Sequence, residues 1–181
     1  MPKAVALFRG INVGGKNLLS MSELRRLAGA LGLGDATTLL QSGNLVFDGD
    51  RRKGTALEKL LEVELARSFS LSVDCSIRTA TEWEAVIAGN PFLKEAESDP
   101  GHMVVMFFKQ PLVADRVREL SEAIQGPEVI RAADRELFLV YPEGIGTSKL
   151  TNAVIERKLA ARGTARNWNT VTKIAAVLRA G

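Results

Sequence analysis

Cysteine and histidine are nearly absent from this 181-residue chain, which has one of each, Cys75 and His102. A single cysteine cannot form an internal disulfide, and this fits a reducing compartment. One cysteine and one histidine make no zinc site without carboxylate ligands, so we expect neither a metal nor a cofactor. No Ser-His-Asp or Cys-His combination is visible, and the catalytic residues, if any exist, stay unassigned.

Long hydrophobic runs are missing as well. No apolar stretch approaches the roughly 20 residues that a membrane-spanning helix needs. Met1-Pro2-Lys3 leads into a short apolar run without a cleavage-site pattern. We therefore expect a cytoplasmic protein with no membrane partner. Its 46% hydrophobic and 25% charged residues are typical of a globular fold.

The pattern in residues 1–80 predicts the order strand, helix, strand, strand, helix, strand. Two capping boxes, Ser20-Met21-Ser22-Glu23 and Thr55-Ala56-Leu57-Glu58, are expected to open the helices. The first helix should end at Gly32 and Gly34, and the second near Arg67. The predicted strands are residues 3–9, 36–40, 45–47 and 71–77, with a turn at 41–44. This is the βαββαβ order of ferredoxin-like folds.

The same order recurs in the second half. A short helix around Trp83 and an acidic connector at 94–101 come first. The predicted strands are then 102–108, 128–132, 136–141 and 164–168, and the predicted helices are 114–124, 149–161 and 170–179. We predict an α+β tandem repeat of two ferredoxin-like subdomains with antiparallel sheets, plus a C-terminal helix. The boundaries are 1–80 for the first subdomain, 81–101 for the helix and connector, and 102–181 for the second subdomain with the closing helix.

The segment between the first strand and the first helix is rich in glycine. It reads Arg9-Gly10-Ile11-Asn12-Val13-Gly14-Gly15-Lys16-Asn17. Backbone N–H groups and the lysine could bind an anion there. The spacing matches the phosphate-binding P-loop up to the lysine, but an asparagine follows where a Ser or Thr must reach Mg²⁺, so nucleotide hydrolysis is not expected. The alternative is a tight connection whose glycines permit positive φ.

Other cations and loops are candidates to join this site. On the assumption that the first and third strands run parallel, their following loops would bring Lys16 together with Arg51-Arg52-Lys53 at one rim. The turn at 41–44 would then lie at the opposite end of the sheet. In the second half, Ser148 and Lys149 follow a glycine-containing loop, so a hydroxyl and a lysine again stand at a predicted helix start.

Near the C-terminus, Arg166, Asn167 and Trp168 form a third candidate. An aromatic ring flanked by an arginine and an amide could stack on a nucleic-acid base. The alternative is a tryptophan that anchors the terminal helix onto the core.

Several motifs resemble a bacterial family of unknown function, DUF1697, along the whole chain. They are Leu7-Phe8-Arg9-Gly10-Ile11-Asn12-Val13-Gly14-Gly15-Lys16-Asn17, Met21-Ser22-Glu23-Leu24-Arg25, Leu40-Gln41-Ser42-Gly43-Asn44, Asn90-Pro91-Phe92, Ser148-Lys149-Leu150 and Thr164-Ala165-Arg166-Asn167-Trp168-Asn169-Thr170-Val171. The resemblance implies two tandem ferredoxin-like subdomains. It implies no activity, cofactor or catalytic residue.

Charge is unevenly distributed, at +3 in residues 1–80, −4 in 81–125 and +4 in 126–181. The basic ends permit an anionic partner. Our first hypothesis is a module that binds a nucleotide or nucleic acid through Arg9, Asn12, Gly14, Gly15, Lys16 and Asn17, with Ser148, Lys149, Arg166, Asn167 and Trp168 as further contacts. The alternatives are an enzyme acting on a small phosphorylated or carboxylated metabolite and a protein-interaction scaffold. The oligomeric state stays open.

Overall fold

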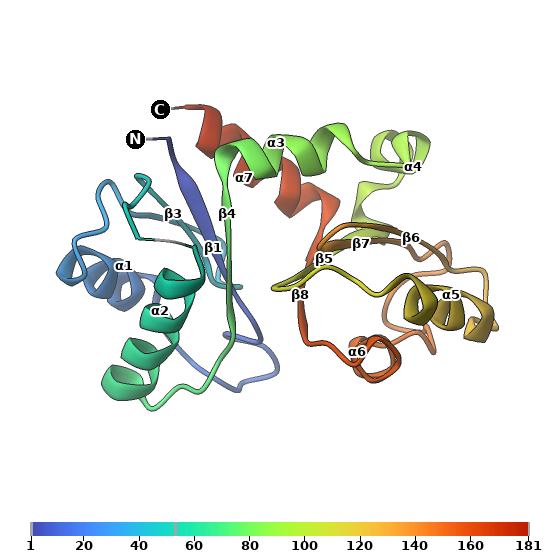
Figure 1. Ribbon diagram of the computed structural model, residues 1–181, viewed down its shortest axis with the longest axis horizontal. Helices are drawn as coiled ribbons and strands as arrows, with labels where there is room; N and C mark the ends of the chain where they lie inside the picture. The colour runs from blue at the N-terminus through green and yellow to red at the C-terminus, as the bar shows by residue number, and fades with distance from the viewer. Residues whose placement is uncertain (1, 53, 181) are drawn as a thin grey trace. The chain divides into compact units, whose positions relative to one another are not determined.

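The computed structural model describes residues 2–52 and 54–180, which form two compact units. Unit 1 comprises Met1–Ala85 with Lys173–Gly181, and unit 2 comprises Val86–Thr172. The first elements in chain order are β1 (Ala4–Phe8), α1 (Met21–Ala30), β2 (Thr37–Leu39), β3 (Asn44–Phe47), α2 (Gly54–Phe69), β4 (Cys75–Thr79), α3 (Ala80–Ala88) and α4 (Leu93–Ser98) (Figure 1). The chain continues through a 3₁₀ turn at Pro100–His102, β5 (Met103–Phe108), α5 (Ala114–Ala123), β6 (Val129–Ala133), β7 (Glu136–Val140), α6 (Asn152–Leu159), β8 (Gly163–Asn167) and α7 (Trp168–Arg179).

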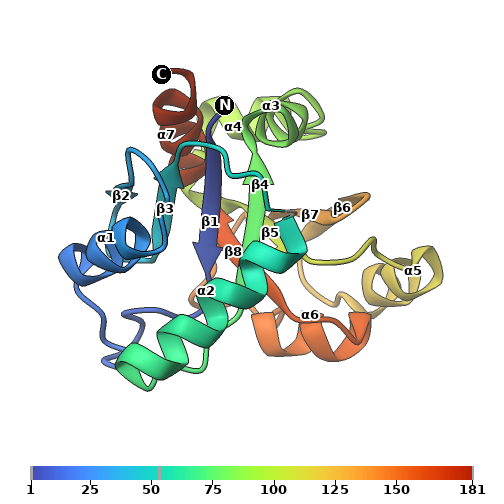
Figure 2. The ribbon, with the colours of Figure 1, turned by 60° about the vertical axis from the view of Figure 1, so that its left-hand side comes forward.

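Each unit contains a four-stranded sheet, and the overall class is α+β as predicted. The strand orders are β2-β3-β1-β4 and β6-β7-β5-β8, and every neighbouring pair is antiparallel. In unit 1, α1 and α2 cover one face of the sheet, where Ala4, Ala6 and Phe8 point (Figure 2). Every residue of β1 and of β5 is buried, so both faces of these strands are covered. This explains why the two strands read as continuous apolar runs rather than alternating ones.

The assumption that the first and third strands run parallel is wrong. β1 pairs antiparallel with β3, with Ala4 opposite Phe47 and Leu7 opposite Asn44. The crossover through α1 brings β2 back parallel to β1, and the hairpin then reverses the chain into β3. Because β3 lies between these two parallel strands, it is antiparallel to both. The loops after β1 and after β3 therefore leave opposite ends of the sheet.

The capping boxes gave one correct and one wrong helix start. Ser20 caps α1, because its hydroxyl accepts from Glu23 N at 3.2 Å and the Glu23 carboxylate accepts from Ser20 N at 3.4 Å. The second box is not formed, since α2 begins at Gly54 and the Glu58 carboxylate accepts from Ile77 N in β4 at 2.8 Å. The Glu58 side chain is buried against the sheet and bonds to β4, so it does not cap the start of α2.

Carboxylates cover the outer edge of β4. Glu58 accepts from Ile77 N, Glu62 accepts from Cys75 N at 2.8 Å, and Glu82 accepts from Thr79 N at 2.8 Å. These backbone N–H groups would otherwise face outward from an edge strand. The strand begins at Cys75 rather than at residue 71 because β1 ends at Phe8, opposite Cys75. The predicted strand at 71–77 thus begins four residues too early and ends two residues too early.

Candidate functional site

The glycine loop folds as a tight hairpin. Lys16 N donates to Val13 O at 3.0 Å, and the two residues form an isolated antiparallel bridge. Gly14 and Gly15 occupy the two central positions with φ of 58° and 73°. Positive φ at both positions is what a type I′ turn needs, so these glycines are required by the turn itself. The tip is exposed, as are Val13 and Leu18 beside it.

Two asparagines hold this hairpin in place. The Asn12 amide donates to Leu19 O at 2.9 Å and to Gln41 O at 2.7 Å, and its oxygen accepts from Leu19 N at 2.9 Å. The Asn17 amide donates to Gly10 O at 3.1 Å. Arg9 also belongs to the framework, since its N–H donates to Asp74 O at 2.9 Å. Arg9, Asn12 and Asn17, which were predicted to contact a ligand, therefore form hydrogen bonds that hold the loop in its conformation.

Three residues of the loop keep groups available to a ligand. Within the described part of the chain, the Gly14 and Gly15 N–H groups and the Lys16 ammonium have no hydrogen-bond or ion-pair partner. The loop is thus both a tight connection and a possible anion contact.

The prediction of which segments lie beside the glycine loop is wrong. The turn at 41–44 lies at the same end of the sheet, where Phe8 N donates to Gly43 O at 3.0 Å and Asn12 reaches Gln41. Arg51 and Arg52 follow β3 and lie at the other end, because β1 and β3 are antiparallel. Lys53 lies outside the described residues.

Arg52 has a structural role. Its guanidinium donates to Leu31 O at 3.0 Å and to both oxygens of Asp50. The hydrogen bond from Arg52 lowers the pKa of Asp50 from 3.8 to about 2. The pair ties the loop after β3 to the end of α1.

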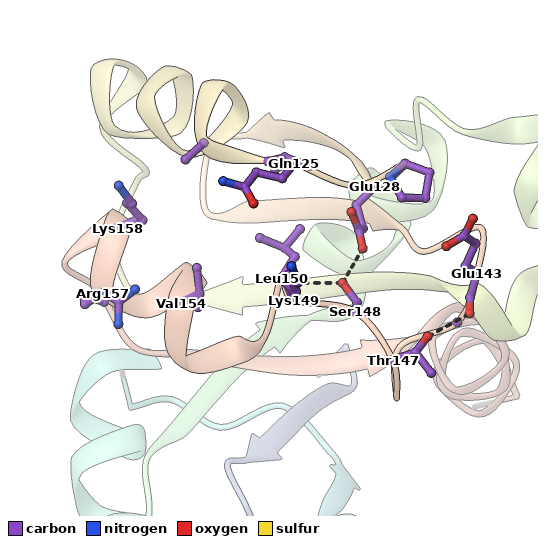
Figure 3. A pocket seen from close by; sticks show the side chains of 15 residues that line it. Gln125, Glu128, Glu143, Thr147, Ser148, Lys149, Leu150, Val154, Arg157 and Lys158 are labelled. Atoms are coloured by element: carbon purple, nitrogen blue, oxygen red, sulfur yellow. Dashed lines mark hydrogen bonds between the residues drawn. The ribbon is translucent and has the colours of Figure 1, made fainter.

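The second site is a pocket of about 740 Å³ in unit 2. Its walls come from residues 123–128 before β6, residues 143, 144 and 147–150 after β7, and Val154, Arg157 and Lys158 of α6 (Figure 3). Ser148 and Lys149 line it, but they precede α6, which begins at Asn152 behind the capping residue Thr151. The predicted helix at 149–161 therefore starts three residues too early. The Ser148 hydroxyl accounts for this, because it accepts from Leu150 N at 3.0 Å and holds a turn there.

A hydrogen bond joins the two loops of the pocket. The Ser148 hydroxyl donates to Glu128, and the Glu128 carboxylate approaches Gly126 so closely that a Cβ at Gly126 would lie 2.3 Å from Glu128 Oε2. Tyr141 lies beneath, and its hydroxyl donates to Leu150 O at 3.1 Å. Burial, with a smaller contribution from the Glu128 charge, raises the pKa of Tyr141 from 10.0 to about 12. Glu128 is a hydrogen-bond acceptor that Ser148 orients.

Unpaired cations line the same pocket. In the part of unit 2 that the structure describes, Lys149, Arg157 and Lys158 are exposed and have no ion-pair or hydrogen-bond partner. Sequence reasoning missed Arg157, Lys158 and Glu128. The signal for the first two was present, since Val154, Arg157 and Lys158 stand at i, i+3 and i+4 of a helix and share a face. Nothing local in the sequence ties Glu128 to Ser148.

The C-terminal candidates are not among the residues that line the pocket of unit 2. Trp168 and Arg166 are buried, with 6% and 8% of their surface exposed, so the ring is not open to a stacking base. Arg166 Nη1 donates to Ala165 O at 2.8 Å, and burial lowers its pKa from 12.5 to about 10. Asn167 caps α7, since its oxygen accepts from Thr170 N at 2.9 Å. This matches the anchor alternative.

The single cysteine and the single histidine lie in different units. Cys75 is buried in the core of unit 1, and His102 Nδ1 lies 2.8 Å from Asp99 Oδ2 in unit 2. Among residues 2–52 and 54–180, no three His, Cys, Asp or Glu side chains are grouped so that they could hold a metal ion. In the same ranges, no helix has the length and apolar character needed to cross a membrane.

Comparison with known proteins now adds the family. The profile described as "Protein of unknown function (DUF1697)" matches residues 1–138. The chain belongs to the DUF1697 family. The solved structure of the conserved bacterial protein SP0830 from Streptococcus pneumoniae is similar to this DUF1697 protein, with 27% identity, a TM-score of 0.77 and 98% of each chain covered. The comparison with curated proteins found no match.

Proposed function

We propose that this DUF1697 protein binds a small anionic ligand of the nucleotide class in the pocket of unit 2. The observation that carries the proposal is the set of unpaired cations, Lys149, Arg157 and Lys158, around a cavity of about 740 Å³. A cavity of this size suits a small organic ligand. Cations that lack a protein partner gain most from a phosphate or carboxylate, because charge-assisted hydrogen bonds are the strong ones.

The fold that positions this pocket supports a tandem ferredoxin-like repeat. The strand order is the same in both units, and equivalent residues share a register: Arg78 stands opposite Val5, and Arg166 stands opposite Val105. Each of these arginines is buried and donates to the carbonyl of the residue before it. In each unit a helix glutamate also accepts from the first N–H of the last strand, Glu62 from Cys75 and Glu156 from Gly163.

Binding is tested by isothermal titration calorimetry with adenosine 5′-monophosphate. The variant Arg157→Ala, Lys158→Ala removes two exposed charges from the rim and should weaken binding about 10- to 100-fold. The matched control is Arg26→Ala, Lys59→Ala, which removes two exposed helix cations from unit 1 and should bind like the wild type. Equal affinities in all three proteins would rule the pocket out.

A second candidate function, binding of a nucleic acid strand, is favoured at the glycine loop. Its tip presents the unpartnered Gly14 and Gly15 N–H groups and the Lys16 ammonium in the described structure, beside exposed Val13 and Leu18. A short single-stranded oligonucleotide should bind with a salt-dependent affinity, and Lys16→Ala should reduce the slope of log K against log salt by about 1. An unchanged slope would remove Lys16 from the interface.

A further inference from the structure

Four charged groups of the unit 2 pocket lie toward two ends according to their sign, and a fifth, Lys149, lies between them (Figure 3). Figure 3 places Arg157 and Lys158 toward one end, on α6, and Glu128 and Glu143 toward the other, on the loops before β6 and after β7. Leu150 and Val154 line the wall between them. The pocket therefore has a cationic end, an anionic end, and a middle in which the apolar Leu150 and Val154 stand near Lys149 and Gln125.

Neither end is neutralised by the protein. Within the described residues of unit 2, none of the four charged side chains forms an ion pair, and the carboxylate of Glu128 is bonded to the neutral hydroxyl of Ser148. A carboxylate accepts hydrogen bonds and donates none. A ligand that is anionic along its whole length would meet repulsion at the Glu128 end, whereas a ligand with hydrogen-bond donors there would be held.

We infer that the pocket selects a bipolar ligand, with its phosphate at Arg157 and Lys158 and the ribose hydroxyls of a nucleotide donating to Glu128 and Glu143. This rests on the proposed function and names the part of the ligand that each end recognises. Ribose hydroxyls are suited to the anionic end because two adjacent O–H donors can reach the carboxylate oxygens without a proton transfer. The apolar side chains of Leu150 and Val154 are suited to the uncharged carbons between phosphate and hydroxyls.

The support of Glu128 adds to this assignment. Ser148 donates a hydrogen bond to one carboxylate oxygen, and the other lies close to Gly126, where a Cβ would stand 2.3 Å from it. An acceptor that a hydrogen bond already orients loses less side-chain freedom when a ligand binds. The Glu143 side chain, in contrast, is exposed and contributes charge without such support.

The test compares adenosine 5′-monophosphate with its 2′,3′-dideoxy analogue, inorganic phosphate and O-phosphoethanolamine, each titrated by calorimetry. The wild type should bind the ribonucleotide at least about tenfold more tightly than the dideoxy analogue. In Glu128→Gln, Glu143→Gln this ratio should fall to about twofold, while inorganic phosphate should bind as tightly as before or more tightly. Far-ultraviolet circular dichroism checks that the variant is folded.

The outcomes separate the two proposals. Equal binding of the ribo- and dideoxynucleotides by the wild type would overturn the bipolar assignment and leave the anion site intact. Stronger binding of O-phosphoethanolamine than of the nucleotide would show that the anionic end prefers an ammonium group, and would overturn the assignment of the ribose hydroxyls to that end. No binding of any probe, or no effect of Arg157→Ala, Lys158→Ala, would overturn the proposed function and this inference with it.

Discussion

The two units share a strand order but elaborate different loops. In unit 1 the long connection is residues 9–20, between β1 and α1, whereas in unit 2 it is residues 141–151, between β7 and α6. The corresponding segments, 109–113 and 48–53, are short. Because the first and third strands are antiparallel, the long loops leave opposite ends of their sheets. The same strand order thus carries an exposed hairpin in unit 1 and a pocket in unit 2.

The contrast is sharpest at the sheet end where the third strand finishes. In unit 1, Arg52 bridges Asp50 and Leu31 O across that end. In unit 2, the equivalent loops are joined by Glu128 and Ser148, and a cavity lies between them. Similar sheets therefore carry a hydrogen-bonded arginine at this end in unit 1 and a charged pocket at this end in unit 2.

The largest expected effect concerns the two long loops. Asn12→Ala removes hydrogen bonds to Leu19 and Gln41 and places alanine at a φ of 54°, so it should destabilise the protein by about 3 kcal/mol. Ser148→Ala should cost only about 1 kcal/mol, because Ser148 is half-buried at a loop surface. Urea unfolding measures both. If both variants lost the same free energy of unfolding, the two loops would contribute equally to stability, and the proposed difference between the units would be wrong.

A second prediction uses Tyr141, the sole tyrosine of the chain. Its absorbance at alkaline pH should show a midpoint near 12 in the folded protein, against 10.0 for an unburied tyrosine. Since the folded pKa is raised, the stability gained from the neutral phenol is complete below pH 10 and lost as pH rises through 12. Glu128→Gln should move the midpoint downward. If the titration midpoint of Tyr141 were the same in Glu128→Gln as in the wild type, the Glu128 charge would have no effect on the pKa of Tyr141.

A third prediction tests the turn in unit 1. Gly14→Ala and Gly15→Ala should each cost about 1 kcal/mol, because each φ is positive. Gly15→Asn, which tolerates this conformation better, should cost less. The midpoint of thermal unfolding measures the three variants. Alanine variants as stable as the wild type would mean that the turn does not need its glycines.

The smallest expected effect comes from Asp50. Its folded pKa of about 2 lies below 3.8, so its contribution is present above pH 4 and lost as pH falls toward 2. Solvent screening limits the contribution to about 1 kcal/mol or less. Asp50→Asn should remove this part of the acid sensitivity, as measured by thermal unfolding between pH 2 and 6. An unaltered pH profile would argue against the Arg52 bridge.

Sequence patterns predicted the elements better than their arrangement. The box at Ser20 and Glu23 worked because both partners lie within one turn of helix, whereas Glu58 bonded to a distant strand that no local pattern reveals. The direction of β3 was inferable from the hairpin before it, and the mistaken assumption misplaced Arg51 and Arg52. Glu128 and Ser148 are far apart in sequence, so their hydrogen bond required the folded sheet.

The carboxylates along β4 have a consequence for assembly. A partner that joins a sheet by β-augmentation must find unsatisfied amides on an outer strand. Glu58, Glu62 and Glu82 already take those of Ile77, Cys75 and Thr79. Any extension of this sheet by an added strand, whether from a peptide or from a misfolded copy, is therefore directed to β2 at the far side.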